Sequence, residues 1–161
     1  MKIEKPYARK RTKTIMVKAD PDQVFALMCP VREYEWEPGW TTNLILSNSG
    51  LVEEDCIFTT PAGASLGSHA KSREAIWVTP IHDPTARRLM MIKVTPDECV
   101  TRLDIFVSAE QSGASVTTSY QHTALTELGR NVVDQHTEVR FDEMMAAWQK
   151  AIEETLEKKA A

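Results

Sequence analysis

The chain has 161 residues, of which 42% are hydrophobic and 26% are charged, and its formal net charge is −4. This length fits one domain, and the apolar fraction excludes an intrinsically disordered or fibrous chain. Apolar runs such as residues 89–92 are too short to span a membrane, and the basic start does not lead into a signal-peptide core. We therefore expect one globular domain over residues 1–161, cytoplasmic and without membrane insertion.

A basic segment opens the chain. Residues 1–18 hold seven Lys/Arg and one acid, a charge of +6, so the remaining residues sum to −10. Such an arm could bind nucleic acid or an acidic membrane, but it lacks the run of interleaved aromatic residues that single-strand binders use. We favour a first strand, about Arg9 to Lys18, whose charges keep a sheet edge soluble, and we expect no nucleic-acid partner.

Two short helical segments are predicted next. Asp20 and Pro21 are typical of an N-cap and a first helical position, and Pro30 should end that helix. A second helical turn over Val31–Trp36 should stop before Pro38.

From Thr41 to about Thr126 the pattern changes to short β-rich runs separated by turn signals. The six predicted strands are Thr42–Ser47, Cys56–Thr60, Ala75–Ile81, Arg88–Thr95, Val100–Ala109 and Ala114–Ala124. Their short connections indicate antiparallel pairing. The small-residue stretch Pro61–Ser68 is suited to a mobile lid.

The C-terminal segment is predicted to be helical. Apolar residues recur at three- and four-residue spacing from Val133 to Leu156, which favours one helix over Glu127–Lys158, with a break near Gly129. A lone helix of that kind would be unstable, so its apolar stripe must lie on the sheet. The expected fold is α+β: a curved seven-stranded antiparallel sheet around a long C-terminal helix, with two short helices after strand 1.

This order of elements, with Ala19–Phe25 after the first strand, resembles the START-like superfamily, also called SRPBCC or Bet v 1-like. The segments Cys29–Trp40, Ser47–Gly50 and Cys56–Thr60 resemble a bacterial branch described as SRPBCC or polyketide cyclase/dehydrase-like. The resemblance implies this helix-grip fold and a deep, mostly apolar cavity between sheet and helix. The superfamily includes lipid carriers, hormone receptors, cyclases, oxygenase subunits and chaperone activators, so fold alone does not fix function.

Strand alternation selects the residues expected to face such a cavity. The inward faces are predicted to carry Met90, Ile92 and Val94; Leu103, Ile105 and Val107; and Val116, Thr118, Tyr120, His122 and Ala124. Tyr120 and His122 are then polar groups on an apolar wall, and His122 could exchange protons or be a hydrogen-bonded structural residue. Glu33, buried beside a tryptophan, would have a raised pKa and could act as an acid or base, or it could be an exposed partner of a cation.

The candidate catalytic residues are therefore Glu33, Tyr120 and His122. Large apolar and aromatic side chains complete the set expected to contact a ligand, and plain core packing is the alternative, favoured for the residues of the C-terminal helix. The predicted ligand-binding residues are Trp36, Trp40, Trp77, Met90, Ile92, Leu103, Ile105, Tyr120, His122, Phe141, Met145 and Trp148.

Metal and redox sites are not predicted. Three widely spaced cysteines argue against a disulfide framework, and neither they nor the four scattered histidines have zinc-ligand spacing. No motif for a phosphate, a dinucleotide or an activated serine is present, so we expect no cofactor.

Three functions are compatible with the sequence. The leading one is binding of a small hydrophobic molecule, such as a lipid, an isoprenoid or a polyketide-like aromatic. The second is a cofactor-independent cyclase, dehydratase or hydrolase acting on such a ligand, and the third is a protein-interaction module of the chaperone-activator type. A homodimer is compatible with each.

Overall fold

The computed structural model describes residues 1–62 and 73–160, so most of the stretch predicted as a lid, Pro61–Ser68, lies outside the described residues. Within these ranges a strand is followed by a short helix and a 3₁₀ turn, η1, then by six strands as predicted, and last by two helices in place of the single predicted one. Their bounds are β1 (Ala8–Val17), α1 (Pro21–Leu27), η1 (Glu33–Glu35), β2 (Leu44–Leu46), β3 (Ile57–Thr60), β4 (Ala75–Asp83), β5 (Arg88–Thr95), β6 (Cys99–Glu110), β7 (Gly113–Ala124), α2 (Glu127–Gln135) and α3 (Glu138–Ala160).

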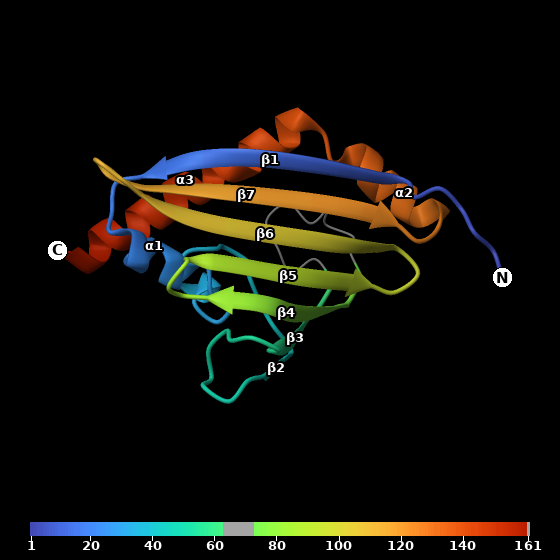
Figure 1. Ribbon diagram of the computed structural model, residues 1–161, viewed down its shortest axis with the longest axis horizontal. Coiled ribbons are helices and arrows are strands. Elements are labelled where there is room, and N and C mark those ends of the chain that lie inside the picture. Colours follow the sequence, from blue (N-terminus) through green and yellow to red (C-terminus); the bar gives the residue numbers. More distant parts are fainter. Residues whose placement is uncertain (63–72, 161) are drawn as a thin grey trace.

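The sheet is antiparallel throughout, with the strand order β1-β7-β6-β5-β4-β3-β2. The sheet curves, and α3 runs obliquely behind it (Figure 1). The predicted α+β helix-grip architecture is therefore confirmed. The outer strand β2 is shorter than predicted, three residues in place of six.

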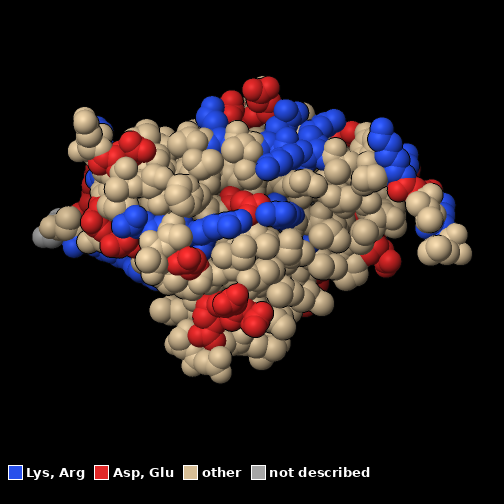
Figure 2. All heavy atoms as spheres, in the orientation of Figure 1, with Lys and Arg blue, Asp and Glu red and all other residues tan. Residues whose placement is uncertain are grey.

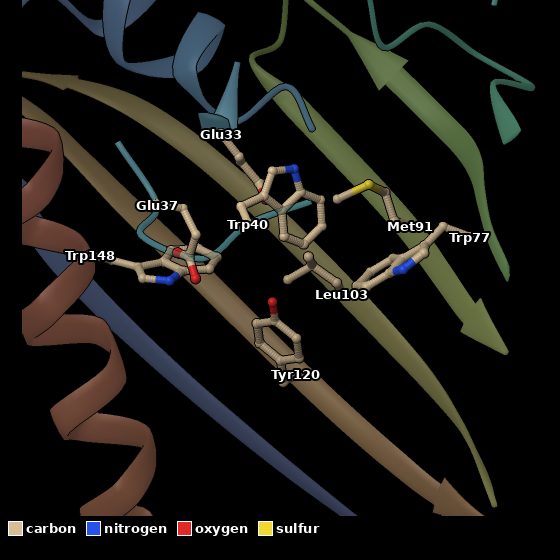
Figure 3. A pocket seen from close by; sticks show the side chains of 8 residues that line it. All are labelled: Glu33, Glu37, Trp40, Trp77, Met91, Leu103, Tyr120 and Trp148. Atoms are coloured by element: carbon tan, nitrogen blue, oxygen red, sulfur yellow. The ribbon is translucent and has the colours of Figure 1, made fainter. Parts of the chain in front are cut away.

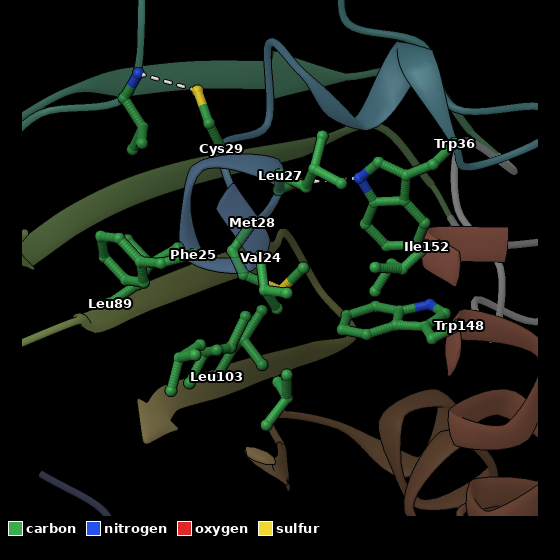
Figure 4. Close-up of a cluster of buried hydrophobic side chains, with 14 of the residues drawn as sticks. Val24, Phe25, Leu27, Met28, Cys29, Trp36, Leu89, Leu103, Trp148 and Ile152 are labelled. Atoms are coloured by element: carbon green, nitrogen blue, oxygen red, sulfur yellow. Dashed lines mark hydrogen bonds between the residues drawn. The ribbon is translucent and has the colours of Figure 1, made fainter. Parts of the chain in front are cut away.

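The inner faces of β6 and β7 are as predicted, because Leu103, Ile105, Val107, Val116 and Thr118 are all buried. The core continues under α1 and reaches α3 through Trp148 and Ile152 (Figure 4). The predicted start of α1 is also confirmed: the Asp20 side chain accepts hydrogen bonds from the backbone of the first helical turn. This cap satisfies donors that the helix itself leaves unpaired.

The C-terminal helix is interrupted, but not where Gly129 suggested. The chain breaks at His136 and Thr137, between α2 and α3, and the Thr137 hydroxyl accepts a hydrogen bond from the Arg140 amide as a new N-cap. Gly129 lies inside α2 at a close approach, where a Cβ would meet the Glu98 carbonyl oxygen at 1.9 Å. The glycine therefore allows α2 to pack closely on the β5–β6 turn and does not mark the end of a helix.

The basic N-terminal strand forms the edge of the sheet beside the acidic C-terminal helices. Figure 2 shows Lys and Arg side chains gathered over β1 and the N-terminal segment. Lys13 Nζ lies 3.1 Å from the Asp142 carboxylate, and Arg9 donates to the Asp134 carbonyl oxygen at 3.0 Å. Part of the charge of this arm is thus neutralised within the molecule.

All three cysteines are buried and free. The Cys29 sulfur accepts a hydrogen bond from the Val52 amide at 3.2 Å, which ties the end of α1 to the loop before β3 (Figure 4). Within the described ranges, no helix is long and apolar enough to cross a membrane.

Candidate functional site

A narrow cavity lies between the concave face of the sheet and α3, closed from one side by η1 and the loop that follows it (Figure 3). The cavity has a volume of about 10 Å³. Two carboxyls and one phenol share the cavity with three indoles and two aliphatic side chains. The lining residues are Glu33, Glu37, Trp40, Trp77, Met91, Leu103, Tyr120 and Trp148.

Consecutive tight turns bring Glu33 and Glu37 to the cavity. The Glu33 amide donates to the Cys29 carbonyl at 3.0 Å, and the Glu37 amide donates to the Glu33 carbonyl at 2.7 Å. This helix-like i, i+4 spacing puts both side chains on one side of the turn. Both point toward the cavity in Figure 3, and only 6% of Glu33 and 5% of Glu37 is exposed to solvent.

Two buried indoles hold this segment against the core. Trp36 donates its Nε1–H to the Leu27 carbonyl at 2.8 Å, and Trp40 donates its Nε1–H to the Pro30 carbonyl at 2.7 Å. Buried indole N–H groups usually need such partners. These bonds fasten the carboxyl-bearing turn to the end of α1 and the residues just after it.

Burial controls the protonation of the polar groups in the cavity. Burial raises the pKa of Glu33 well above its usual range, and the neighbouring Glu37 carboxylate raises it further. Burial also raises the pKa of Tyr120 well above its usual range, with smaller contributions in the same direction from Glu33 and Glu37. Neutral Glu33 and neutral Tyr120 are both hydrogen-bond donors and acceptors.

Glu33 and Tyr120 have no hydrogen-bond partner among the described residues. The indole Nε1 of Trp148, a residue that is 4% exposed, is also buried without a partner in that part of the chain. Unpaired buried polar groups cost free energy unless something else satisfies them. The cavity therefore concentrates hydrogen-bonding capacity that the described protein does not use.

Aromatic rings form the remaining walls. Trp40 meets Trp77 edge to face with centroids 6.4 Å apart, and Tyr120 meets Trp148 in the same way at 6.4 Å. Phe58 stacks on Trp77 at 5.3 Å. Such contacts give a large apolar wall with fixed ring orientations.

His122 lies outside this cavity. Its Nδ1 is 2.6 Å from the Thr101 hydroxyl, and its ring packs edge to face on His136 with centroids 4.5 Å apart. Its ring centroid is 6.0 Å from that of Tyr120, so the two share the inner face of β7 without sharing the cavity. Of the alternatives for His122, the hydrogen-bonded structural residue matches this geometry.

The structure brings six of the predicted site residues together at the cavity: Glu33, Trp40, Trp77, Leu103, Tyr120 and Trp148. Others are in the core beside it without lining it: Trp36, Ile105, Phe141 and Met145. Trp36 packs edge to face on Trp148 at 5.3 Å and so supports the wall from behind.

The prediction that Met90, Ile92 and Val94 of β5 face inward is wrong. Met91 pairs with Leu103, and Met90 and Ile92 pair with Asp104 and Arg102. Directly paired residues share a face, so Met90 and Ile92 lie on the outer side with two charged residues. Residues 89–92 are all apolar, so the sequence does not alternate there and does not show which side chains of β5 face inward.

Other inward-facing residues were not predicted from the sequence. Met91 and Lys93 follow from the corrected phase of β5. Glu37 stands four residues after Glu33, a spacing that was visible, but its burial depends on contacts with the sheet that only the folded chain makes. No group of three or more His, Cys, Asp or Glu side chains in the described ranges could hold a metal ion.

No model of a known protein family and no curated protein sequence matches this chain. Solved structures are similar to it in fold. A point mutant of norcoclaurine synthase from Thalictrum flavum, in complex with a transition state analogue, has a TM-score of 0.69 and 14% identity, covering 98% of this chain and 99% of that one. A protein of unknown function from Staphylococcus aureus has a TM-score of 0.64 and 12% identity over 94% of this chain and 98% of its own.

Ara h 8.0201 has a TM-score of 0.60 and 8% identity, covering 91% of this chain and 98% of that one. These matches run over nearly the whole length of both partners, and they agree with the strand order and the long C-terminal helix described above. At these identities the likeness establishes the fold alone. The chain therefore shares the helix-grip fold of these solved structures.

Proposed function

We propose that the protein binds a small hydrophobic ligand between the concave face of the sheet and α3, and that Glu33 and Tyr120 receive a polar group of that ligand. One observation carries the proposal: buried Glu33 and partly buried Tyr120 share a cavity walled by three indoles, and neither side chain has a hydrogen-bond partner among the described residues. A ligand hydroxyl or carbonyl would satisfy them, and its apolar body would lie on the rings.

The energetics favour an amphipathic ligand over a purely apolar one. Burying apolar area contributes roughly 25 cal/mol per Å², less the cost of association. A hydrogen bond to a buried polar group adds about 1 kcal/mol. A lipid, an isoprenoid or a polyketide-like aromatic with one hydroxyl would satisfy both requirements.

The size of the cavity sets a condition on binding. The cavity volume of about 10 Å³ admits a group the size of a water molecule. Binding sites for drug-sized ligands have volumes of about 300–1,000 Å³. A larger ligand must therefore move side chains apart. We expect this conformational change to slow the association of such a ligand.

The test compares two probes of similar shape, 1-naphthol and 1-methylnaphthalene, by isothermal titration calorimetry. The wild-type chain should bind 1-naphthol about fivefold more tightly, the worth of one hydrogen bond. Tyr120→Phe should remove most of that preference and leave binding of 1-methylnaphthalene unchanged. Tyr34→Phe is the matched control, because Tyr34 is exposed and bonds Thr42 outside the cavity.

Failure of both probes to bind would contradict the proposal, as would equal affinity for the two in the wild-type chain. Native mass spectrometry of the freshly purified chain adds an unbiased readout. A bound small molecule that is retained by the wild-type chain and lost from Tyr120→Phe would support the assignment.

A second candidate function is hydrolysis or dehydration with Glu33 as general acid. The observation that favours it is the raised pKa of Glu33 beside the Tyr120 hydroxyl, which could donate to a developing oxyanion. With 1-naphthyl acetate as probe, Glu33→Gln should lower the rate at least about 100-fold, and Glu35→Gln, on the outside of the same turn, should not. An unchanged rate in Glu33→Gln would exclude this role.

A further inference from the structure

Lys93 stands on the inner wall of the sheet next to the cavity. It pairs with Trp77 across β4 and β5 and lies two residues after Met91, so it shares the face of these two cavity-lining residues. Its Nζ lies over the Trp77 ring, 5.4 Å from the centroid. The side chain is partly buried, and its amine lies against a ring that itself lines the cavity.

This lysine differs from those on the surface. Lys13 pairs with Asp142 at 3.1 Å and Lys150 pairs with Glu154 at 3.8 Å, both at exposed positions. No carboxylate lies within 4.0 Å of Lys93 Nζ, and no hydrogen bond reaches it, among the described residues. An amine that is partly desolvated and unpaired is favoured in its neutral form.

Two groups near the β5–β6 turn face the amine. The Glu98 carboxylate and the Cys99 thiol both act to keep the proton on Lys93, but burial outweighs them and lowers the pKa of the amine below its usual range. Burial raises the pKa of Cys99, so this thiol stays protonated and is a poor competing nucleophile. The nucleophilic group at this end of the wall is thus the amine.

We propose that Lys93 is a covalent anchor that condenses with the carbonyl carbon of an aldehyde or ketone held in the cavity. This rests on the proposed function, because the cavity must first admit the ligand. The Nζ lone pair attacks the carbonyl carbon and the C=O π electrons move to oxygen. Proton transfer from nitrogen to oxygen gives a carbinolamine, which loses water to leave a C=N bond.

The surroundings also suit the product. The protonated imine is a cation, and a cation over an indole face is stabilised by about 0.5–2 kcal/mol. The Glu98 carboxylate, buried at the adjoining turn, adds an attractive charge. Burial thus favours the neutral amine that attacks, and the Trp77 ring and the Glu98 carboxylate partly offset the cost of burying the cationic product.

The test is reductive trapping with 1-naphthaldehyde and sodium cyanoborohydride near neutral pH, followed by peptide mapping. Each unit by which a lysine pKa is lowered raises its neutral fraction about tenfold. Lys93, whose amine has a lowered pKa, should therefore be labelled faster than exposed Lys150, and 1-naphthol should protect Lys93 without protecting Lys150. Lys93→Arg keeps the positive charge but lacks the nucleophilic amine. This variant should lose the label at position 93 and keep the labels on its other lysines.

Labelling of Lys93 no faster than Lys150, or fast labelling that 1-naphthol does not slow although it binds, would overturn the inference. The labelling rates of Lys93 and Lys150 are compared within the wild-type chain. A folding defect in Lys93→Arg would therefore not decide the result. Binding of 1-naphthol is measured separately by calorimetry. If 1-naphthol binds and Lys93 is unreactive, the anchor is refuted and the ligand-binding function stands; if 1-naphthol does not bind, the proposed function fails first.

Discussion

Replacing Glu33 by glutamine should stabilise the protein by an amount that grows with pH. Glutamine has nearly the same shape as the protonated carboxyl but cannot ionise. Because the folded chain raises the pKa of Glu33, the folded state holds a proton that the unfolded state releases as pH increases. Stability from this group is therefore fully present below the unfolded pKa and is lost as pH rises toward the folded pKa.

The magnitude follows from the ordinary pKa of 4.5 in the unfolded chain. Holding the proton costs about 1.4 kcal/mol for each pH unit above that value, so the cost approaches about 3 kcal/mol at pH 7 while the folded carboxyl remains protonated. We expect Glu33→Gln to raise the free energy of unfolding by about 1–3 kcal/mol at pH 7 and by almost nothing at pH 4. Urea denaturation across this range measures the difference.

Glu35, two residues away, supplies a control of opposite sign. A hydrogen bond from Arg32, assisted by one from Lys159, lowers its pKa to about 2. Its stabilising contribution is present above the unfolded pKa and is lost as pH falls toward 2. Because its side chain is 34% exposed, solvent screening reduces the effect of Glu35→Gln at pH 7 to a loss of about 1 kcal/mol. A Glu33→Gln difference that does not vary with pH, or a loss of stability at pH 7, would refute the reasoning.

Further predictions concern packing and buried hydrogen bonds, and each is measured by urea denaturation. Gly129→Ala should destabilise by about 1–3 kcal/mol, because its Cβ would meet backbone at 1.9 Å, whereas Gly50→Ala, with open space around it but φ of +78°, should cost about 1 kcal/mol. Equal losses at the two glycines would contradict the close approach of α2. Thr101→Val should cost about 1–2 kcal/mol by breaking the partly buried bond to His122, and Thr117→Val, which breaks an exposed bond, should cost less than about 0.5 kcal/mol. A larger loss at Thr117 would argue against the structural role of that histidine.

The order of elements could be predicted because local signals mark it. The Asp20-Pro21 helix start, the turn residues between strands and the C-terminal apolar stripe all act within a few residues of the chain. The break at Thr137 was missed because this threonine falls in step with the apolar stripe, and its capping role shows only in the bond to the Arg140 amide.

The cavity was less predictable than the fold because it depends on long-range placement. Tyr120 could be assigned inward because its strand alternates clearly, but Met91 could not, since both faces of its strand are apolar there. The phase of β5 is decided by pairing with β6, and the burial of Glu37 by the docking of its loop on the sheet. Lys93 illustrates the same limit: a charged residue on an inner face contradicts hydrophobic patterning, and such exceptions concentrate at functional sites.

The position of β1 in the sheet has a consequence for the way this protein is made. Ile15 pairs with Val116, which lies 101 positions later in the chain. At about 5–20 residues per second, the ribosome takes roughly 5–20 s to deliver the partner of a strand that it made first. During that interval β1 has no neighbour to pair with, and the lysines and arginines spaced along it keep this waiting strand in solution and away from the β strands of other nascent chains.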